Sequence, residues 1–509
     1  MRINDSQRLI LGPPGTGKTT TILNKIETLL GAGVKPERIA FVSFTRKAVM
    51  EAAGRACARF GLDRESFRYF RTIHSLCFQE LGTARGAMIG RNDLISLGNM
   101  IGLRLTANFN MDEGAVLFIN DEKGSKLLFL DNLARIMCVN NVEARNESGM
   151  DVPIDDLNDF SRKYRLFKES RSKLDFTDLL FEYIDTGAPI DVDYFFVDEA
   201  QDLSVAQWRV LQIAARRAKQ VIICGDDDQS IFKWSGASLE TFLALEGERT
   251  VLGQSYRLPQ AVFSMAKDII SNVHDRFTKE FNPTGEIGEV KRVLTLNEAN
   301  IEESESTLIL VRNVYLLDDV YEYLQNNSLN FSGRGKHQGV NEDHLRAIVC
   351  WERLRKGEAI SMDDARCCYA ALHVGGVLAR GGKAALERAE DTGDKLTFET
   401  LRDCYGLLDM PIWHKALDMI PGDKINYYIS LLEKGKRLSE RADVHANTIH
   451  GVKGGEADHV IILSDMARRT YLDMQRDRDS ENRVAYVAVT RAKKRVTIVE
   501  PAGKFCFRY

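Results

Sequence analysis

The amino-acid sequence predicts an α/β protein with two parallel-sheet cores, each interrupted by a mainly helical insertion. Three observations support this prediction: a glycine-rich loop that joins an apolar run to a helical pattern near the start of the chain, further apolar runs in the first half, and a second set of such runs after residue 285. Apolar strands that alternate with helices are typical of parallel sheets with both faces covered. A chain of 509 residues is also too long for a single core.

The glycine-rich loop covers residues 12–19, GPPGTGKT, and fits the phosphate-binding pattern G-x-x-x-x-G-K-[ST]. An apolar run at 9–11 precedes it, and apolar residues at three- and four-residue spacings follow it over 22–30. Its glycines would let backbone N–H groups turn toward phosphate oxygens, and the following helix would add its positive end. We therefore predict a nucleoside triphosphate site made by Gly12, Pro13, Pro14, Gly15, Thr16, Gly17, Lys18, Thr19 and Thr20.

The other expected strands are short, apolar runs. In the first core they cover 39–44, 194–197 and 221–224, and in the second core 289–293, 307–311, 460–463 and 496–499. Two long stretches lack this alternation and are rich in helix formers. The expected division is therefore 1–80 with 160–252 for the first core, 81–159 for its helical insertion, 253–330 with 444–509 for the second core, and 331–443 for the second insertion.

Two adjacent acids follow the apolar run at 194–197, where ligands of a parallel sheet bind. We expect Asp198, together with the hydroxyl of Thr19, to bind Mg²⁺ directly or through water. Glu199 is expected to orient or deprotonate the attacking water, and Lys18 to contact the β- and γ-phosphates. Adjacent acids also begin many helices, but their combination with a phosphate loop favours nucleotide hydrolysis.

The composition is that of an ordinary globular protein, with 44% hydrophobic and 28% charged residues. A formal net charge of -4 argues against a protein that coats duplex DNA, although a local groove with aromatic side chains can still hold a single strand. The nine cysteines include no C-x-x-C pair, so neither a zinc site nor a disulfide framework is indicated. The sequence shows no signal peptide and no apolar run of membrane-spanning length, so we expect a cytoplasmic protein with no membrane partner.

Further motifs resemble those of superfamily 1 helicases of the UvrD/PcrA/Rep type, in the family's order along the chain. They are DEAQD at 198–202, GDDDQSIFKWSGA at 225–237, QSYRLP at 254–259, TIHGVKGGE at 448–456 and VAYVAVTRAK at 484–493. The resemblance implies two RecA-like cores, ATP and Mg²⁺ as cofactors, and DNA as the substrate. Residues 175–180, DFTDLL, match another signature of the family.

The resemblance assigns further residues to the ATP site. Gln7 is expected to read the adenine edge, Tyr256 to stack on adenine, and Gln229 to sense the γ-phosphate. Arg257 and Arg491 match arginines that reach the phosphates in the family, where two cations would stabilise transition-state charge. The expected catalytic residues are therefore Lys18, Asp198, Glu199, Gln229, Arg257 and Arg491.

The resemblance also implies contacts with a DNA strand. Hydroxyls and cations suited to phosphate contacts, and two aromatic residues, are matched to this role: Thr45, Arg46, Thr72, His74, Phe232, Trp234, Thr448 and His450. Phe232 and Trp234 fit platforms on which bases stack, and they also fit a hydrophobic core. Three positions depart from the family's pattern. Ser235 stands where arginine is usual, and Gly455 and Ala457 stand where leucine and phenylalanine usually flank the glutamate that matches Glu456, an expected ATP-site residue.

The leading hypothesis is an ATP-dependent DNA helicase that moves 3′ to 5′ along single-stranded DNA and unwinds duplex, a polarity implied by the resemblance alone. The expected partners are single-stranded DNA, single-strand/duplex junctions, and replication or repair proteins. The alternatives are a helicase subunit of a RecB/AddA-like recombination complex, a DNA-dependent ATPase that acts mainly as a translocase, and a non-hydrolysing DNA-binding or scaffold protein. The intact set of expected catalytic residues argues against the last of these.

Overall fold

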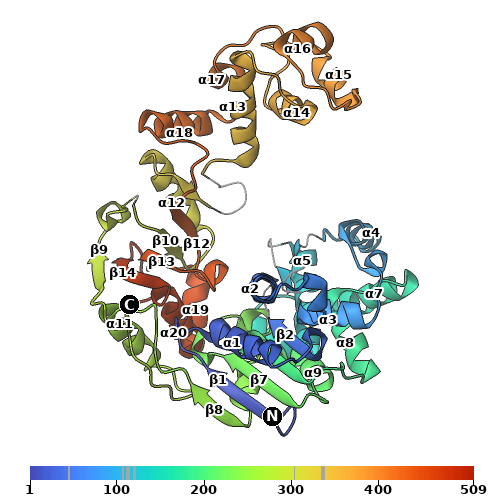
Figure 1. The fold of residues 1–509 in the computed structure, drawn as a ribbon, viewed down its shortest axis with the longest axis vertical. Helices are drawn as coiled ribbons and strands as arrows, with labels where there is room; N and C mark the ends of the chain where they lie inside the picture. The colour runs from blue at the N-terminus through green and yellow to red at the C-terminus, as the bar shows by residue number, and fades with distance from the viewer. Residues whose placement is uncertain (44–45, 106–107, 111–114, 118–121, 303, 334–338) are drawn as a thin grey trace. The chain divides into compact units, whose positions relative to one another are not determined.

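The structure is a computed structural model that describes residues 1–509 except 44–45, 106–107, 111–114, 118–121, 303 and 334–338. The chain forms two compact units. The first unit is Met1–Glu289 with Leu472–Lys494, and the second unit is Val290–Tyr471 with Arg495–Tyr509 (Figure 1). In the described part of the chain, no helix is both long and apolar enough to cross a lipid bilayer.

The first unit contains a six-stranded sheet with the order β3-β2-β6-β7-β1-β8, in which each adjacent pair of strands is parallel. The strands are β1 (Gln7–Leu11), β2 (Ile39–Ser43), β3 (Phe70–Thr72), β6 (Tyr194–Asp198), β7 (Gln220–Gly225) and β8 (Glu248–Val251). Figure 1 shows β1 between β7 and β8. Because β6, β7 and β1 are neighbours and parallel, the loops that follow them meet at one edge of the sheet.

Alternating residues of this sheet enter two hydrophobic clusters, one on each face. Ile10 and Phe196 pack in the cluster that includes α1 (Lys18–Gly31) and α2 (Arg46–Phe60). Leu9 and Val197, each one residue away, pack on the other face. The helices of that face are α3 (Ile73–Glu80), α5 (Lys123–Met137), α7 (Ile154–Ser170), α8 (Phe176–Thr186) and α9 (Val205–Ala214).

The interval 81–159, expected to be helical, contains helices and also a short antiparallel pair of strands that was not expected. Its elements are α4 (Arg91–Ile101), β4 (Asn108–Asn110), β5 (Ala115–Leu117), α5, α6 (Asn141–Ser148) and the start of α7. The first unit is completed by α10 (Leu239–Leu243), α11 (Gln260–Ile270) and α20 (Arg478–Val489).

The second sheet is also six-stranded, with the order β11-β12-β10-β13-β14-β9. Its strands are β9 (Glu289–Val293), β10 (Thr307–Val311), β11 (Phe331–Ser332), β12 (Val444–Thr448), β13 (Ala457–Leu463) and β14 (Ala492–Val499). The predicted α/β fold with two parallel sheets is therefore confirmed, and the strands expected from apolar runs all form. The compact units divide the chain by packing, so the expected assignment of 253–289 and 472–494 to the second core stays a prediction.

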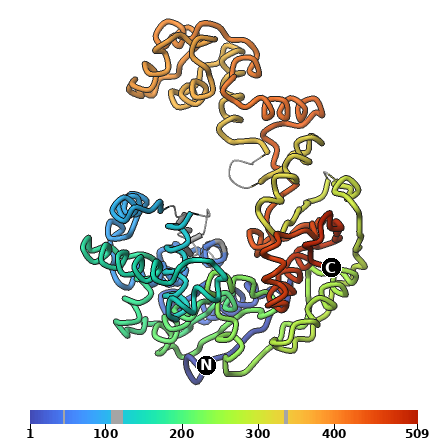
Figure 2. Tube along the Cα trace, turned by 180° about the vertical axis from the view of Figure 1, so that it is seen from behind, coloured from blue at the N-terminus to red at the C-terminus, as the bar shows by residue number. Residues whose placement is uncertain are grey.

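Helices separate β11 from β12 in sequence, and Figure 2 follows the chain through them. They are α13 (Glu342–Arg355), α14 (Met362–Ala370), α15 (Gly382–Arg388), α16 (Phe398–Tyr405), α17 (Trp413–Ala416) and α18 (Gly422–Glu433). The remaining helices are α12 (Leu316–Asn326), after β10, and α19 (Arg468–Arg476), after β13. The described residues between β11 and β12 contain helices and irregular segments, as expected for this stretch.

Candidate functional site

The candidate phosphate loop joins β1 to α1, and α1 begins at Lys18. Gly15 and Gly17 have φ values of 72° and 75°, in the left-handed region that favours glycine. Lys18 Nζ donates to the carbonyl oxygen of Gly12 at 2.8 Å, and a Cβ at position 12 would lie only 2.0 Å from Cγ of Lys18. Among the described residues no side chain caps the first turn of α1, so its positive end is directed at the loop. This is the geometry of an anion cradle.

The segment after β8 lies against the loop. The hydroxyl of Ser255 donates to the carbonyl oxygen of Pro14 at 2.8 Å, and the N–H of Tyr256 donates to the carbonyl oxygen of Gly15 at 2.8 Å. A Cβ on Gly15 would lie 2.4 Å from Cβ of Arg257. Tyr256 is 77% exposed, so its side chain is accessible to a ligand beside the loop.

The paired acids lie at the end of β6 and beside α1: Asp198 is the last residue of the strand, and Glu199 follows it. Asp198 is fully buried, and its Oδ2 accepts a hydrogen bond from the Thr19 hydroxyl at 2.8 Å. Burial and the neighbouring Glu199 raise the pKa of Asp198 to about 7, although Thr19 and Lys18 oppose the shift. The carboxylate of Glu199 accepts a hydrogen bond from Nε2 of Gln201 at 2.6 Å. Sequence reasoning expected both acids here, and the structure brings them to the loop.

The residues present fit a magnesium ion bound together with a nucleotide. The Thr19 hydroxyl and the Asp198 carboxylate are hard oxygen donors within hydrogen-bond distance of each other, and Mg²⁺ prefers such donors together with substrate phosphates. Within the described part of the chain, no group of three or more His, Cys, Asp or Glu residues could hold a metal ion. The pair Thr19 and Asp198 fits Mg²⁺ that is held jointly with phosphate oxygens.

In the first unit Gln229 contacts Arg491, and Arg257 contacts Thr490, the residue before Arg491. Oε1 of Gln229 accepts a hydrogen bond from Nη2 of Arg491 at 2.8 Å, and its Nε2 donates to Asp226 at 2.6 Å. Arg491 is buried, and Nη1 of Arg257 donates to the carbonyl oxygen of Thr490 at 3.3 Å. Residues far apart in sequence are thus gathered near the loop, as the expected ATP site requires.

Gln7 is not brought to this site. It is the first residue of β1, whereas the loop follows the other end of that strand. Its Oε1 accepts a hydrogen bond from the N–H of Ile3 at 2.8 Å, and its Nε2 donates to the carbonyl oxygen of Glu246 at 2.6 Å. The oxygen and the nitrogen of the Gln7 amide are therefore both hydrogen-bonded to backbone groups. The structure gives no support to an adenine contact by Gln7.

The residues of the first unit expected to bind phosphates of DNA differ in exposure. Arg46 is exposed at the start of α2, and Thr45 lies outside the described residues. Thr72 and His74 are buried where β3 meets α3. Burial lowers the pKa of His74 to about 4, so its imidazole is neutral near pH 7. In this structure Thr72 and His74 do not present a surface to a DNA strand.

The two aromatic candidates lie in the segment after Gln229. Trp234 is 44% exposed and Phe232 is partly buried. The hydroxyl of Ser235, which stands where the family usually has arginine, donates to the carbonyl oxygen of Phe232 at 2.9 Å. Trp234 therefore has an accessible ring surface, which a purely structural core residue would not have.

The candidate residues of the second unit lie at the end of β12, whose last residue is Thr448, and in the segment that follows it. Thr448 is buried, and its hydroxyl accepts a hydrogen bond from the N–H of Gly451 at 3.2 Å. His450 is partly buried and Glu456 is exposed. The expected DNA contacts of Thr448 and His450 and the expected ATP contact of Glu456 stay predictions.

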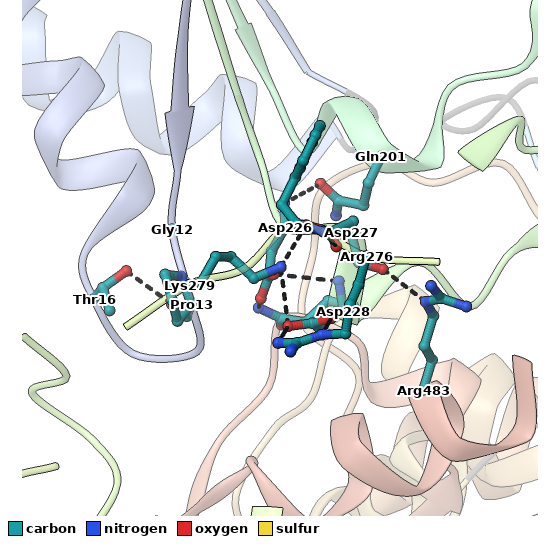
Figure 3. A network of polar contacts seen from close by, with 12 residues as sticks. Gly12, Pro13, Thr16, Gln201, Asp226, Asp227, Asp228, Arg276, Lys279 and Arg483 are labelled. Carbon is teal, nitrogen blue, oxygen red and sulfur yellow. Dashed lines mark hydrogen bonds and ion pairs between the residues drawn. The ribbon is translucent and has the colours of Figure 1, made fainter. Parts of the chain in front are cut away.

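The sequence did not indicate a role for Gln201, Asp226 and Lys279, whose side chains contact one another or the expected site residues (Figure 3). Oε1 of Gln201 accepts a hydrogen bond from the N–H of Asp226 at 2.9 Å, and Lys279 Nζ lies 2.9 Å from Oδ1 of Asp226. Gln201 and Asp226 lie inside motifs that could have indicated them. No local pattern marks Lys279, because its partners are distant in sequence.

A glycine-rich loop between a parallel strand and a helix, with acids at the end of a nearby strand, defines the class of P-loop α/β proteins. Comparison with known families identifies a family within this class. Residues 2–249 match the UvrD/REP helicase N-terminal domain, and residues 443–499 match the UvrD-like helicase C-terminal domain. The two matches together span more than half of the chain, which belongs to the UvrD/REP helicase family.

Individual relatives are distant and longer. The chain is 27% identical over 333 residues to the ATP-dependent DNA helicase Rep of Buchnera aphidicola subsp. Baizongia pistaciae, which covers 59% of this chain and 46% of the relative. It is 26% identical over 331 residues to the ATP-dependent DNA helicase PcrA of Leuconostoc citreum, which covers 59% of this chain and 42% of the relative. The matched regions thus span less than half the length of these curated relatives.

Proposed function

We propose that this chain is an ATP-driven DNA helicase motor that moves 3′ to 5′ on single-stranded DNA and unwinds duplex. One observation carries the proposal: the phosphate loop, the Asp198–Glu199 pair and the Gln229–Arg491 contact gather in one compact unit. Membership of the UvrD/REP helicase family supports the same function. The polarity rests on the family resemblance.

The proposed hydrolysis uses the chain's own groups in distinct roles. Lys18 and the loop would bind the phosphates, and Mg²⁺ would neutralise phosphate charge at Thr19 and Asp198. Glu199, oriented by its hydrogen bond from Gln201, would accept a proton from the attacking water. Arginine side chains would stabilise charge that develops on the phosphates in the transition state.

Further groups are proposed to bind adenine, the phosphates and DNA. Tyr256 would stack on adenine, since its backbone is bonded to the loop and its ring is exposed. Arg257 would join Arg491 at the phosphates. Trp234 would stack on bases of a single strand, a contact that tolerates any sequence and suits a motor that must not read bases. Partners among replication or repair proteins belong to the same proposal.

Unwinding assays on tailed duplexes test this function. Duplexes carrying either a 3′ or a 5′ single-stranded tail are incubated with the protein, ATP and Mg²⁺, and both strand separation and ATP hydrolysis are measured. We expect DNA-stimulated hydrolysis and preferential unwinding of the 3′-tailed duplex, and loss of both in Lys18→Ala. Hydrolysis without unwinding would favour the translocase alternative, whereas unwinding of only the 5′-tailed duplex would reverse the proposed polarity.

A further inference from the structure

Three consecutive aspartates, Asp226, Asp227 and Asp228, follow β7, and all are nearly inaccessible to solvent. One buried ammonium group contacts all three. Lys279 Nζ lies 2.9 Å from Asp226 and 2.9 Å from Asp228, and it also forms an ion pair with Asp227 (Figure 3). An unpaired charge at such depth is strongly unfavourable, so the contacts of Lys279 with all three carboxylates stabilise this acidic triplet.

Two further contacts fix the segment that carries Lys279. The guanidinium of Arg276 forms a bidentate ion pair with the carboxylate of Asp228, in which Nε and Nη2 donate hydrogen bonds at 2.8 and 2.6 Å. The N–H of Phe277 donates to Oδ2 of Asp227 at 2.9 Å. The ammonium of Lys279 is therefore held in place by both its backbone neighbours and its charge partners.

The charges determine the protonation of the triplet. Burial alone would raise the pKa of Asp226, but Lys279 and Lys18 hold it below its usual value. Burial and the two neighbouring carboxylates raise the pKa of Asp227 to about 6, against the pull of Lys279. The three carboxylates raise the pKa of Lys279 above its ordinary value despite burial. Asp226 is thus an ionised carboxylate near pH 7.

Asp226 connects this cluster to the proposed ATP site. Its Oδ2 accepts from Nε2 of Gln229, and the Oε1 of that amide accepts from Arg491. Its backbone N–H donates to Gln201, whose Nε2 donates to Glu199. Asp226 is therefore the junction between the proposed γ-phosphate sensor and the proposed water-activating acid.

The direction of the Gln229 amide depends on the charge of Asp226. An ionised carboxylate only accepts hydrogen bonds, so it turns the NH₂ of Gln229 toward itself and the carbonyl oxygen toward Arg491. A protonated Asp226 could donate to that oxygen and allow the flipped amide, which would present NH₂ to a guanidinium. Without Lys279, burial would favour the protonated form.

We propose that Lys279 is a positioning residue of the ATP site, which holds Asp226 as an acceptor and thereby fixes the Gln229 amide against Arg491. The inference rests on the proposed function, since it assigns Lys279 a role in ATP turnover. Lys279 lies outside all the sequence motifs described above, between those at 254–259 and 448–456.

A double-mutant cycle tests the inference in the full-length chain. Lys279→Met and Gln229→Ala are made singly and together, and kcat and KM for ATP are measured with saturating single-stranded DNA. Lys168→Met is the matched control, because Lys168 is also buried in the first unit and its Nζ binds Asp175 at 2.7 Å and Asp178 at 2.5 Å. Unfolding midpoints are recorded for each variant, and turnover is measured well below them.

Lys279→Met should lower kcat about ten- to a hundredfold while KM for ATP changes less than about threefold, as expected for loss of a hydrogen bond to a charged group. In the Gln229→Ala background the same substitution should change kcat by no more than about twofold, because residues in one network are not additive. Lys168→Met should leave kcat unchanged in both backgrounds.

Independent, multiplicative losses in the double variant, or an equal loss in Lys168→Met, would overturn the inference. If Lys279→Met does not fold, Lys279→Gln, which keeps N–H donors but no charge, enters the same cycle with the same expected result. A wild-type chain without DNA-stimulated turnover would instead overturn the proposed function and this inference with it. Wild-type turnover with independent losses would overturn only the role of Lys279.

Discussion

At Glu199 the backbone has a φ of 53°, in the left-handed region that residues other than glycine rarely occupy. The turn is held by the N–H of Glu199, which donates to Oδ1 of Asp198 at 3.0 Å, and by the contact of its carboxylate with Gln201. Such a conformation costs on the order of 1–3 kcal/mol and persists where surrounding contacts determine it. The strain therefore lies at the residue that we propose to activate water.

Replacement of Glu199 by Gln tests that role. Glu199→Gln keeps the size and the acceptor oxygen but removes the basic carboxylate, so nucleotide binding should remain while turnover falls by about 10²-fold or more. Binding of a fluorescent ATP analogue and steady-state hydrolysis with DNA measure the two effects separately. Glu143→Gln, at an exposed position of α6, is the control. Near-normal turnover in Glu199→Gln would show that another group activates the water.

His74 gives the first unit a pH-dependent stability. Burial lowers its pKa to about 4, with Asp175 opposing the shift, from an ordinary value of about 6.5. Because the folded-state pKa is the lower one, its contribution is complete above about pH 6.5 and is lost as the pH falls toward 4, on the order of 3 kcal/mol in all. Urea unfolding between about pH 7 and pH 4.5 measures this, and His74→Gln should flatten the dependence. Parallel pH profiles for wild type and variant would contradict the assignment.

At the scale of elements, apolar runs predicted the strands whose two faces are both buried, whereas no such run marked the edge strand β8. β6 and β7 are continuous apolar runs because both of their faces are buried. β8, at the edge of its sheet, reads Glu-Arg-Thr-Val and is mostly exposed, so no apolar run marks it. The site follows the same physics: Lys18 and Asp198 were predictable because motifs at strand ends carry them, whereas Lys279 is positioned by tertiary packing alone.

The DFTDLL signature, for which the sequence suggested no role, begins α8 in the structure. Asp175 is the N-cap of α8, and its carboxylate accepts a hydrogen bond from the N–H of Asp178 at 2.8 Å. The carboxylate of Asp178 in turn accepts a hydrogen bond from the N–H of Asp175 at 2.9 Å. Asp175 also binds Arg135 of α5 at 2.6 Å and Lys168 of α7 at 2.7 Å. The Asp175 side chain thus caps the N-terminus of α8 and links α8 to α5 and α7.

Removal of that side chain should destabilise the first unit strongly. Asp175→Ala deletes a helix cap and removes one of the two carboxylates that the partly buried Arg135 and the buried Lys168 share, the other being Asp178, which should cost about 3–5 kcal/mol. Chemical unfolding monitored by circular dichroism measures the loss. Asp159→Ala is the control, because Asp159 forms surface ion pairs with Arg162 and Lys163 in the same unit and its loss should barely move the midpoint. Similar midpoints for the two variants would show that the buried cluster contributes little.

At the scale of the whole molecule, the chain passes between the compact units after Glu289, Tyr471 and Lys494. Each passage falls inside a regular element, namely β9, α19 and β14. Arg491, which contacts Gln229, directly precedes β14 of the second sheet. A change at the proposed γ-phosphate contact therefore has a short covalent path into that sheet.

The helices between β11 and β12 contain none of the residues proposed to hydrolyse ATP, so their removal should leave a working ATPase. The ends of this stretch are neighbours, because β11 and β12 pair in parallel with Phe331 opposite Val444, a separation of about 4.8 Å. Because the two strands are parallel, the chain has to cross back to the start of β12, so a Gly-Ser linker of about a dozen residues can replace 333–443. The loss of Tyr427, whose hydroxyl donates to the carbonyl oxygen of Leu329 at 2.7 Å, should lower the stability of the second unit. We expect DNA-stimulated hydrolysis to persist in the folded deletion variant and to disappear when Lys18→Ala is added. A folded, monodisperse deletion variant without any hydrolysis would show that these helices are part of the motor itself.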